Sequence, residues 1–466
     1  MTALLVRGGE LVPGRIADVR CGGDRIVEIA PGLRPRPGET VVDADGGAVL
    51  PGLHDHHLHL LSLAAAVTSM RCGPPEVIDH SGLSQTLRAA PPGWVRGIGY
   101  HESVAGSLDR FALDRMVADR PVRVQHRSGA LWMLNSRAVA ELWLGNEPGV
   151  ERDDEGRPTG RMWRADALLR ERLGTPHPPD LSAVGHRLSA LGITGVTDAT
   201  PDLDGDTVGL LASAAAGGEL PQRLQLLGAP TGAPLPPRVT VGPSKILPPD
   251  HEPPDWAALR AKVLAAHAQD RPVAIHAVTR ESLVVALAVL REVGTLPEDR
   301  IEHAAVVGQD LLPLLAEIGP VVVTQPGFIA ERGDQYRRDL PAAIADLYRY
   351  ASLLGAGLRV APSSDAPFAS EDPWRTMAAA LQRRTTEGVV FGAAERVAAG
   401  QVLDGLLAPL ERPGGGRRRI EIGAPADLCV LRVPLDEALR DPDARLVGAT
   451  VCAGRVAYHA ESGQVS

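Results

Sequence analysis

Lysine is almost absent from this sequence of 466 residues. Of the 48 basic residues only two, Lys245 and Lys262, are lysines, and the other 46 are arginines. We attribute this skew, together with the many alanines, to a GC-rich genome, which makes it a mutational bias rather than a functional signal. It does mean that each remaining lysine has persisted against the bias.

Excess positive charge and paired cysteines are also missing. The sequence has 48 Lys and Arg residues and 57 Asp and Glu residues, so its formal net charge is -9. An acidic balance argues against a nucleic-acid-binding protein. Because no CxxC pair exists, we expect no zinc ribbon, redox pair or disulfide framework. The four cysteines are Cys21, Cys72, Cys429 and Cys452.

Long apolar runs do not occur. The start of the chain, MTALLVRGGELV, lacks the basic residues and long apolar segment of a signal peptide. No stretch reaches the ~18 apolar residues of a membrane-spanning helix. Together with the unpaired cysteines, this favours a cytoplasmic protein that binds neither membranes nor nucleic acids.

The two ends of the chain resemble each other. Residues 1–50 and 405–466 contain short β-like runs separated by Gly- and Pro-rich turns such as GG, PG and GAPAD. The two ends flank a much longer middle region. We therefore expect them to form one small composite domain, a β-sandwich built from both termini.

The middle region, residues 51–404, alternates between apolar strand-like runs and Ala/Leu-rich helical stretches. Pro272–Val278 followed by Glu281–Val293 is one example. Such alternation predicts an α/β fold with parallel strands, and its length favours a closed (β/α)₈ TIM barrel. Nine candidate strands are one too many, so either Trp94–Tyr100 or Arg223–Leu227 is extra. Residues 72–173 read as a long insertion.

The strongest chemical signal is Pro51-Gly-Leu-His-Asp-His-His-Leu-His-Leu60. Side chains alternate along a strand, so His57 and His59 share a face with Asp55, while His56 and Leu58 point the other way. Two imidazoles on one strand face can grip one metal ion. The run follows an apolar strand and precedes an apolar helix, which places it where barrel active sites form. The alternative is a His-rich surface loop.

Three more candidate ligands lie at later strand ends. His276 ends Val-Ala-Ile-His-Ala and His303 ends Arg-Ile-Glu-His-Ala. Each alone could be a packed histidine, but two on successive strand tips after an HxH strand indicate metal ligands. Asp365, in Ser-Ser-Asp-Ala-Pro, is either a turn residue or a metal ligand that also serves as general base.

Lys245 lies between the His59 and His276 strands, in Val-Gly-Pro-Ser-Lys-Ile. A neutral lysine amine can add carbon dioxide to become a carbamate, an anionic ligand able to bridge two metal ions, whereas arginine stays charged. The alternative is a structural or substrate-binding lysine. Lys262, in the helical stretch Trp256–Gln269, reads as a solvated surface residue.

These residues and motifs resemble the amidohydrolase superfamily, in particular the amidohydrolase-3 branch with its N-substituted formamide deformylase-like proteins. The ordered set HxH, Lys, His, His, Asp carries the resemblance, which covers essentially the whole chain. The supporting segments are PGLHDHHLH, GAPADL, TGRMWRAD, GPSKILPPD, RIEHAAV, TQPGFIAERGDQY and SSDAPFASEDPW.

The resemblance implies a (β/α)₈ barrel beside a β-sandwich and one or two divalent metal ions, usually zinc, sometimes iron or manganese. It assigns His57 and His59 to the more buried ion and His276 and His303 to the more exposed one. Carboxylated Lys245 would bridge them. A metal-bound hydroxide would attack an amide-like carbonyl, while Asp365 takes the water's proton and returns it to the departing amine. The catalytic set is then Asp365, Lys245 and His303.

Other positions are less defined. His54 and His56 stand where relatives often have apolar or small residues, so they either support the ligands or are tolerated. Candidate substrate-binding residues lie in the loops after strand-like segments; they are His126, Arg127, Arg280 and Arg332. His126 could donate to an oxyanion or be structural, and Trp374 is expected to pack.

We therefore expect a metal-dependent hydrolase of a non-peptide C–N bond in a small-molecule amide, formamide or cyclic amide. One alternative is deamination or ester/lactone hydrolysis on the same scaffold, although Lys245 argues against deamination. Another is a non-catalytic assembly protein, which would typically have lost ligands that this sequence retains. The family favours a homo-oligomer.

Overall fold

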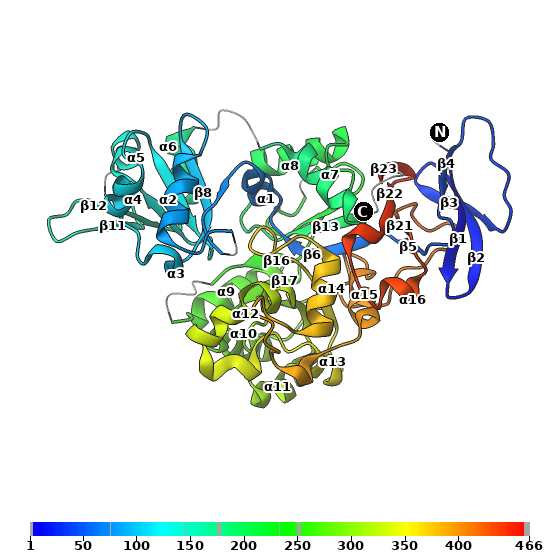
Figure 1. The fold of residues 1–466 in the computed structure, drawn as a ribbon. Helices are drawn as coiled ribbons and strands as arrows, with labels where there is room; N and C mark the ends of the chain where they lie inside the picture. Colours follow the sequence, from blue (N-terminus) through cyan, green and yellow to red (C-terminus); the bar gives the residue numbers. More distant parts are fainter. Residues whose placement is uncertain are drawn as a thin grey trace. The chain divides into compact units, whose positions relative to one another are not determined.

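The computed structural model describes residues 3–74, 76–144, 146–174, 179–232, 234–248 and 253–460. The chain divides into two compact units (Figure 1), one comprising Met1–Leu60 with Leu181–Ser466 and the other Leu61–Asp180. The end of the GPSKILPPD segment, residues 249–250, lies outside the described residues. No helix among the described residues is long and apolar enough to cross a bilayer.

Two small sheets come from the chain ends. The N-terminal sheet has the order β3-β2-β1-β4 and the other has the order β23-β22-β21-β5, so a strand from the start of the chain pairs with strands from its end. The strands are β1 (Ala3–Val12), β2 (Arg15–Gly22), β3 (Arg25–Ala30), β4 (Thr40–Asp43), β5 (Val49–Pro51), β21 (Leu428–Leu431), β22 (Val447–Cys452) and β23 (Arg455–His459).

The two chain ends share one hydrophobic core. Buried side chains from the N-terminal sheet, such as Leu4 and Val19, pack in the same cluster as Leu428 and Val451. Backbone hydrogen bonds also join the ends, including one from the Ile26 amide to the Ala424 carbonyl at 2.9 Å. Neither sheet would bury its apolar face alone, so the termini depend on each other.

Asp427, in the GAPAD turn, ties this composite region to the parallel strands. Its buried carboxylate accepts from Arg223 Nε at 2.7 Å, from Arg238 Nη2 at 3.1 Å and from the Ala453 amide at 2.7 Å. Burial alone would raise the Asp427 pKa, but the nearby Arg238 and Arg223 charges hold it below its ordinary value. The turn is therefore held by two ion pairs with arginines and by a hydrogen bond from a backbone amide.

Replacing Asp427 by asparagine should lower the free energy of unfolding by about 2 kcal/mol, because two guanidinium groups lose their buried partner. A carboxyl group whose pKa is lowered in the folded state stabilises the fold at pH values above its unfolded-state pKa of about 4. This stabilisation is lost as the pH falls through the folded-state pKa. Denaturant unfolding near neutrality and in acid checks this. The exposed Asp441→Asn is the control, and equal stability of both variants at neutral pH would contradict the assignment.

Within the described ranges, nine strands run parallel in two sheets, with orders β15-β14-β13-β6 and β16-β17-β18-β19-β20. Arg223–Leu226 is one of them, whereas Val95–Tyr100 lies in the other unit. The strands are β6 (Leu53–Leu58), β13 (Ile193–Asp198), β14 (Arg223–Leu226), β15 (Val239–Val241), β16 (Ser244–Ile246), β17 (Val273–Ala277), β18 (Arg300–His303), β19 (Val321–Thr324) and β20 (Val360–Pro362).

Backbone hydrogen bonds connect the two parallel sheets at both edges. At one edge β15 and β16 are separated only by Gly242-Pro243, and the Lys245 amide donates to the Leu227 carbonyl at 3.3 Å. At the other edge the Asp365 amide donates to the His57 carbonyl at 2.8 Å, and the His59 amide donates to Ala366 at 2.9 Å. The carboxyl ends of β6 and β20, which carry predicted ligands, are therefore joined directly.

Helices follow β13, β16, β17, β18, β19 and β20, as the sequence predicts, whereas no helix among the described residues separates β14, β15 and β16. Local signals set their ends: α10 starts at a Thr279–Ser282 capping box and stops before Gly294. The helices are α7 (Leu181–Ala190), α8 (Gly205–Gly217), α9 (Trp256–His267), α10 (Arg280–Val293), α11 (Leu312–Ile318), α12 (Gly327–Asp339), α13 (Ala351–Gly355), α14 (Pro373–Gln382), α15 (Ala399–Leu406) and α16 (Leu435–Ala438).

The unit Leu61–Asp180 has its own sheet, ordered β11-β12-β10-β9-β8-β7, and its own hydrophobic core around Leu83, Leu113 and Val124. Helix α1 (Leu60–Val67) begins at its boundary. Its other elements are β7 (Met70–Arg71), α2 (His80–Arg88), β8 (Val95–Tyr100), α3 (Glu102–Ala105), α4 (Arg110–Met116), β9 (Val122–His126), β10 (Leu131–Leu134), α5 (Ser136–Glu141), β11 (Val150–Arg152), β12 (Pro158–Trp163) and α6 (Asp166–Leu173).

Candidate metal centre

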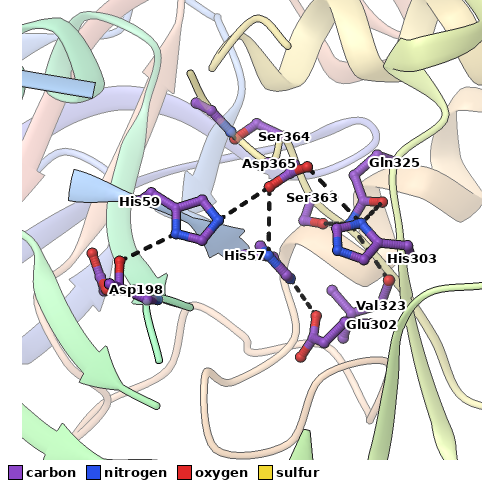
Figure 2. Close-up of polar contacts among 12 residues, drawn as sticks. His57, His59, Asp198, Glu302, His303, Val323, Gln325, Ser363, Ser364 and Asp365 are labelled. Atoms are coloured by element: carbon purple, nitrogen blue, oxygen red, sulfur yellow. Dashed lines mark hydrogen bonds and ion pairs between the residues drawn. The ribbon is translucent and has the colours of Figure 1, made fainter. Parts of the chain in front are cut away.

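Three predicted ligands converge where β6 and β20 end. His57 Nε2 lies 3.5 Å from Asp365 Oδ1, and His59 Nε2 lies 3.3 Å from the same oxygen. Figure 2 shows these side chains turned toward one another. Two ligand atoms bound to one ion at about 2.1 Å with tetrahedral angles would be roughly 3.4 Å apart. The spacing therefore fits a shared metal ion.

The backbone at two of these positions is held in an unusual conformation. His303 has φ +72° and Asp365 has φ +58°, in the left-handed region that non-glycine residues seldom adopt. Such conformations cost on the order of 1–3 kcal/mol each and persist where the surroundings over-determine them. Both residues are predicted metal ligands, so the strained backbone occurs at positions where the direction of the side chain matters for metal binding.

The Nδ1 atoms of three predicted ligands, His57, His59 and His303, also have polar partners. His57 Nδ1–H donates a short hydrogen bond to the Glu302 carboxylate, which leaves His57 Nε2 directed at Asp365. Thr200 Oγ1 lies 3.1 Å from His59 Nδ1, and Gln325 Oε1 lies 2.9 Å from His303 Nδ1. Partners of this kind fix the orientation and tautomer of metal-binding imidazoles.

The remaining predicted histidines extend the cluster. The His303 ring centroid is 4.8 Å from that of His57 and 4.5 Å from that of His276, which comes from the neighbouring strand β17. His303 Nδ1 lies 3.9 Å from Asp365 Oδ2. Four imidazoles and one carboxylate from four strand ends are thus successive neighbours, here called the ligand row, and within it His57, His59 and Asp365 have the spacing of ligands to one ion.

Lys245, on β16, is the remaining predicted ligand. Its side chain is buried, and among the described residues Nζ has no hydrogen-bond partner. Burial lowers the Lys245 pKa, although the Glu302 and Asp365 carboxylates oppose this, which favours the neutral amine that carbamate formation requires. An unpaired buried amine is costly, and a carbamate bound to metal would remove that cost.

Electrostatics favour neutral side chains at His57 and His303 and an ionised Asp365. Burial lowers the His303 pKa to about 4 and holds the His57 pKa well below its ordinary value. Burial opposes ionisation of Asp365, but the His59 hydrogen bond and the neighbouring histidines keep its pKa below the ordinary range. These are the protonation states that ligation needs.

Two buried charged residues beside the ligands were not predicted. Arg300 Nε lies 2.6 Å from Glu302 Oε1, and both side chains are almost completely buried. A signal was present, because Arg300-Ile-Glu302 places two charges on one face of an apolar strand immediately before His303. Glu302 is separated from its partner His57 by 245 residues, which no local pattern connects.

The β6 run alternates as expected. Asp55 accepts from the Ser364 amide at 3.2 Å and from the His57 amide at 3.1 Å, and burial raises its pKa to about 6. His54 and His56 bond instead to the carbonyls of Ala408 and Gly405, at 2.9 and 3.1 Å. They therefore hold β6 to the end of α15 and do not join the ligand row.

The predicted substrate-binding residues come from both units of the chain. On α10, Arg280 forms a two-point ion pair with Asp310 on the surface. On α12, Arg332 donates to the Phe368 carbonyl and stacks over Phe328 at 4.5 Å. His126 and Arg127 belong to the unit Leu61–Asp180.

Two further predictions about single residues can be compared with the fold. Trp374 is fully buried, and its Nε1 donates to the Leu191 carbonyl at 3.0 Å, so it packs as expected. Lys262 is exposed on α9.

Comparison with known proteins identifies the class. The model of the amidohydrolase family, amidohydrolase-3 branch, matches residues 40–458. The N-substituted formamide deformylase of Arthrobacter pascens is 27% identical over 507 residues, covering 93% of this chain and 90% of that protein. The chain therefore belongs to the amidohydrolase family and is a hydrolase that acts on carbon–nitrogen bonds.

Solved structures agree on the fold. An uncharacterized metal-dependent hydrolase from Pyrococcus horikoshii OT3 superposes with a TM-score of 0.70 at 19% identity, over 99% of this chain and 100% of that one. A second, from Pyrococcus furiosus, gives 0.63 at 19% identity, over 86% and 92%. The family and these neighbours imply an α/β TIM-barrel fold.

Proposed function

We propose that the protein is a metal-dependent hydrolase of a non-peptide carbon–nitrogen bond, with N-substituted formamides and related small amides as substrates. The convergence of His57, His59 and Asp365 beside an unpaired, buried Lys245 carries the proposal. The name of the Arthrobacter pascens relative supports the formamide class.

The ligand row would hold the metal as follows. His57 and His59 would hold the more buried ion, and His276 and His303 would hold a second, more exposed ion if two are present. Lys245 Nζ would add carbon dioxide, release one proton and supply a carbamate as an anionic ligand. When bound, zinc (or iron or manganese) lowers the pKa of a coordinated water and polarises the substrate carbonyl.

The chain's own residues do the proton chemistry. Asp365 takes a proton from the attacking water and delivers it to the leaving nitrogen, a role that needs the ionised carboxylate described above. Glu302 holds His57, and Gln325 holds His303, so that the ligand nitrogens stay directed at the reacting region. Arg332, His126 and Arg127 remain proposed substrate contacts, and Arg280 is left out because Asp310 occupies its guanidinium.

The same proposal covers the architecture. The joined parallel sheets form a closed (β/α)₈ barrel within 51–404, with β15 and β16 as one strand broken at Gly242-Pro243. Residues 1–50 and 405–466 form the β-sandwich, and residues 72–173 form the insertion. A cytoplasmic location and a homo-oligomeric state belong to the proposal as well, and fractionation and sizing would test them.

A substrate panel tests the function. Protein freed of metal by chelation should lose hydrolysis of N-substituted formamides and regain it with Zn²⁺ or Mn²⁺, measured as amine and formate release. N-acyl amides, cyclic imides, amino-heterocycles and lactones complete the panel. Ammonia from amino-heterocycles alone would favour a deaminase, and turnover of lactones alone an esterase. Absence of both metal binding and turnover would favour a non-catalytic protein.

A further inference from the structure

Asp55 is a buried carboxylate on β6 that has no role in the proposed chemistry. Strand alternation puts it on the same face as His57 and His59. The ligand atoms that cluster at the end of β6 nevertheless come from His57, His59 and Asp365. A carboxylate that is only 3% exposed must be satisfied by hydrogen bonds, so its partners indicate what it does.

The partners of Asp55 lie on both sides of the junction between β6 and the segment that follows β20. Its Oδ1 accepts the backbone N–H of His57 at 3.1 Å and that of Ser364 at 3.2 Å. Its Oδ2 accepts a short hydrogen bond from the Ser364 hydroxyl. Two of these three donors belong to the residue immediately before Asp365. Asp55 therefore connects the strand that carries His57 to the segment that carries Asp365.

Ser364 extends this connection to the residue on the other side of Asp365. Its Oγ accepts the Ala366 N–H at 3.0 Å, and the Ala366 carbonyl accepts the His59 N–H at 2.9 Å. The Asp365 N–H itself donates to the His57 carbonyl at 2.8 Å. The backbone is thus held at three successive residues, and the two that flank Asp365 are held through the carboxylate of β6 and the serine hydroxyl.

These hydrogen bonds surround a strained position. Asp365 has φ +58°, a conformation that persists only where the surroundings impose it. Its Oδ1 lies 3.5 Å from His57 Nε2 and 3.3 Å from His59 Nε2. Groups that bind or react must be held within about 0.5 Å of the productive geometry. A relaxed backbone at Asp365 would turn the carboxylate away from the ligand row.

We propose that Asp55 and Ser364 are positioning residues for Asp365. They hold its left-handed backbone and so direct its carboxylate at the ligand row, without binding metal themselves. Because Asp365 carries the proton in the proposed function, the catalytic part of this inference rests on that function.

Two substitutions break the connection at different atoms. Asp55→Asn keeps Oδ1 for both backbone N–H groups but puts an amide donor where Oδ2 accepts the Ser364 hydroxyl. Ser364→Ala removes the hydroxyl and leaves the Ala366 N–H without its acceptor. At saturating Zn²⁺ we expect kcat for the best substrate to fall about 10–100-fold in both variants, with KM within about twofold of wild type.

Ser364→Thr is the rescue variant, because it keeps the hydroxyl. Ser364 borders a small cavity, so the added methyl group has space nearby. We expect kcat close to that of wild type. Ser370→Ala is the matched control: this serine lies in the same loop, but its Oγ accepts the Asp372 N–H at 3.4 Å and has no bond to the Asp365 segment.

Hydrogen–deuterium exchange of the metal-free, full-length protein tests the positioning without any turnover. The amides of residues 364–368 should exchange at least ~10-fold faster in Asp55→Asn and Ser364→Ala than in wild type, Ser364→Thr and Ser370→Ala. If wild type hydrolyses no substrate, the proposed function fails, and the exchange rates still decide whether Asp55 and Ser364 hold this segment.

Three results would overturn the proposal. The first is wild-type exchange of residues 364–368 in folded Asp55→Asn and Ser364→Ala, whatever happens to kcat. The second is a loss of kcat that excess Zn²⁺ restores, because Asp55 would then serve to retain metal. The third is a folded Ser364→Thr that is as impaired as Ser364→Ala, which would show that the hydroxyl is not what matters.

Discussion

Lys245→Ala is expected to lower kcat/KM for the best substrate by roughly 10³-fold or more and to reduce the metal content of the purified protein. The reason is that Nζ is buried beside the ligand row with no hydrogen-bond partner in the described part of the chain, at a place where a carbamate would bridge the ions. Lys245→Arg should fail equally, because a guanidinium cannot form the carbamate and brings a buried charge to the site.

Because the sequence contains only two lysines, a lysine carbamate signal can be assigned to one residue with a single control variant. Lys262 is the one other lysine in the sequence, and it is exposed on α9. After equilibration with ¹³C-bicarbonate, a lysine carbamate signal should appear in wild type and Lys262→Ala and be missing from Lys245→Ala. A signal that survives in Lys245→Ala, or full metal content and activity in that variant, would rule out the bridging role.

Local sequence rules selected candidate ligands that lie close together in the fold, for a definite reason. Each candidate lies at the carboxyl end of a strand, and parallel strands bring those ends to one edge. Alternation along β6 correctly separated His57 and His59 from His56, which bonds to Gly405 on the other side. Short sequence patterns were enough to select these residues, because the parallel packing of the strands brings strand ends together that are far apart in the sequence.

The supporting residues could not be derived in this way. Glu302 and His57 lie on different strands, and Thr200 reaches His59 from the segment after β13. Which of several polar residues meets which imidazole depends on register and side-chain packing, not on spacing in the chain. The choice of the extra strand was left open for a similar reason: Trp94–Tyr100 and Arg223–Leu227 both have the composition of a parallel strand, and only pairing shows that Val95–Tyr100 belongs to the sheet of the unit Leu61–Asp180.

Substitutions at Glu302 should have the second largest effect. Glu302→Gln keeps an acceptor for His57 Nδ1 but removes the charge, and we expect metal affinity to fall about 10–100-fold. Glu302→Leu removes the acceptor as well. It also leaves Arg300 as a buried cation without its partner, which should lower the free energy of unfolding by about 3–5 kcal/mol.

A double variant separates these two effects. Arg300→Met combined with Glu302→Leu replaces the buried ion pair by apolar side chains of similar volume, so stability should recover toward that of wild type. Metal affinity should stay low, because His57 still lacks the partner that directs Nε2 toward Asp365. Thermal unfolding of the metal-free protein and competitive metal titration measure the two quantities independently. If the double variant regained both, Glu302 would serve only to balance Arg300, and the orientation of His57 would have to come from the packing of β6 alone.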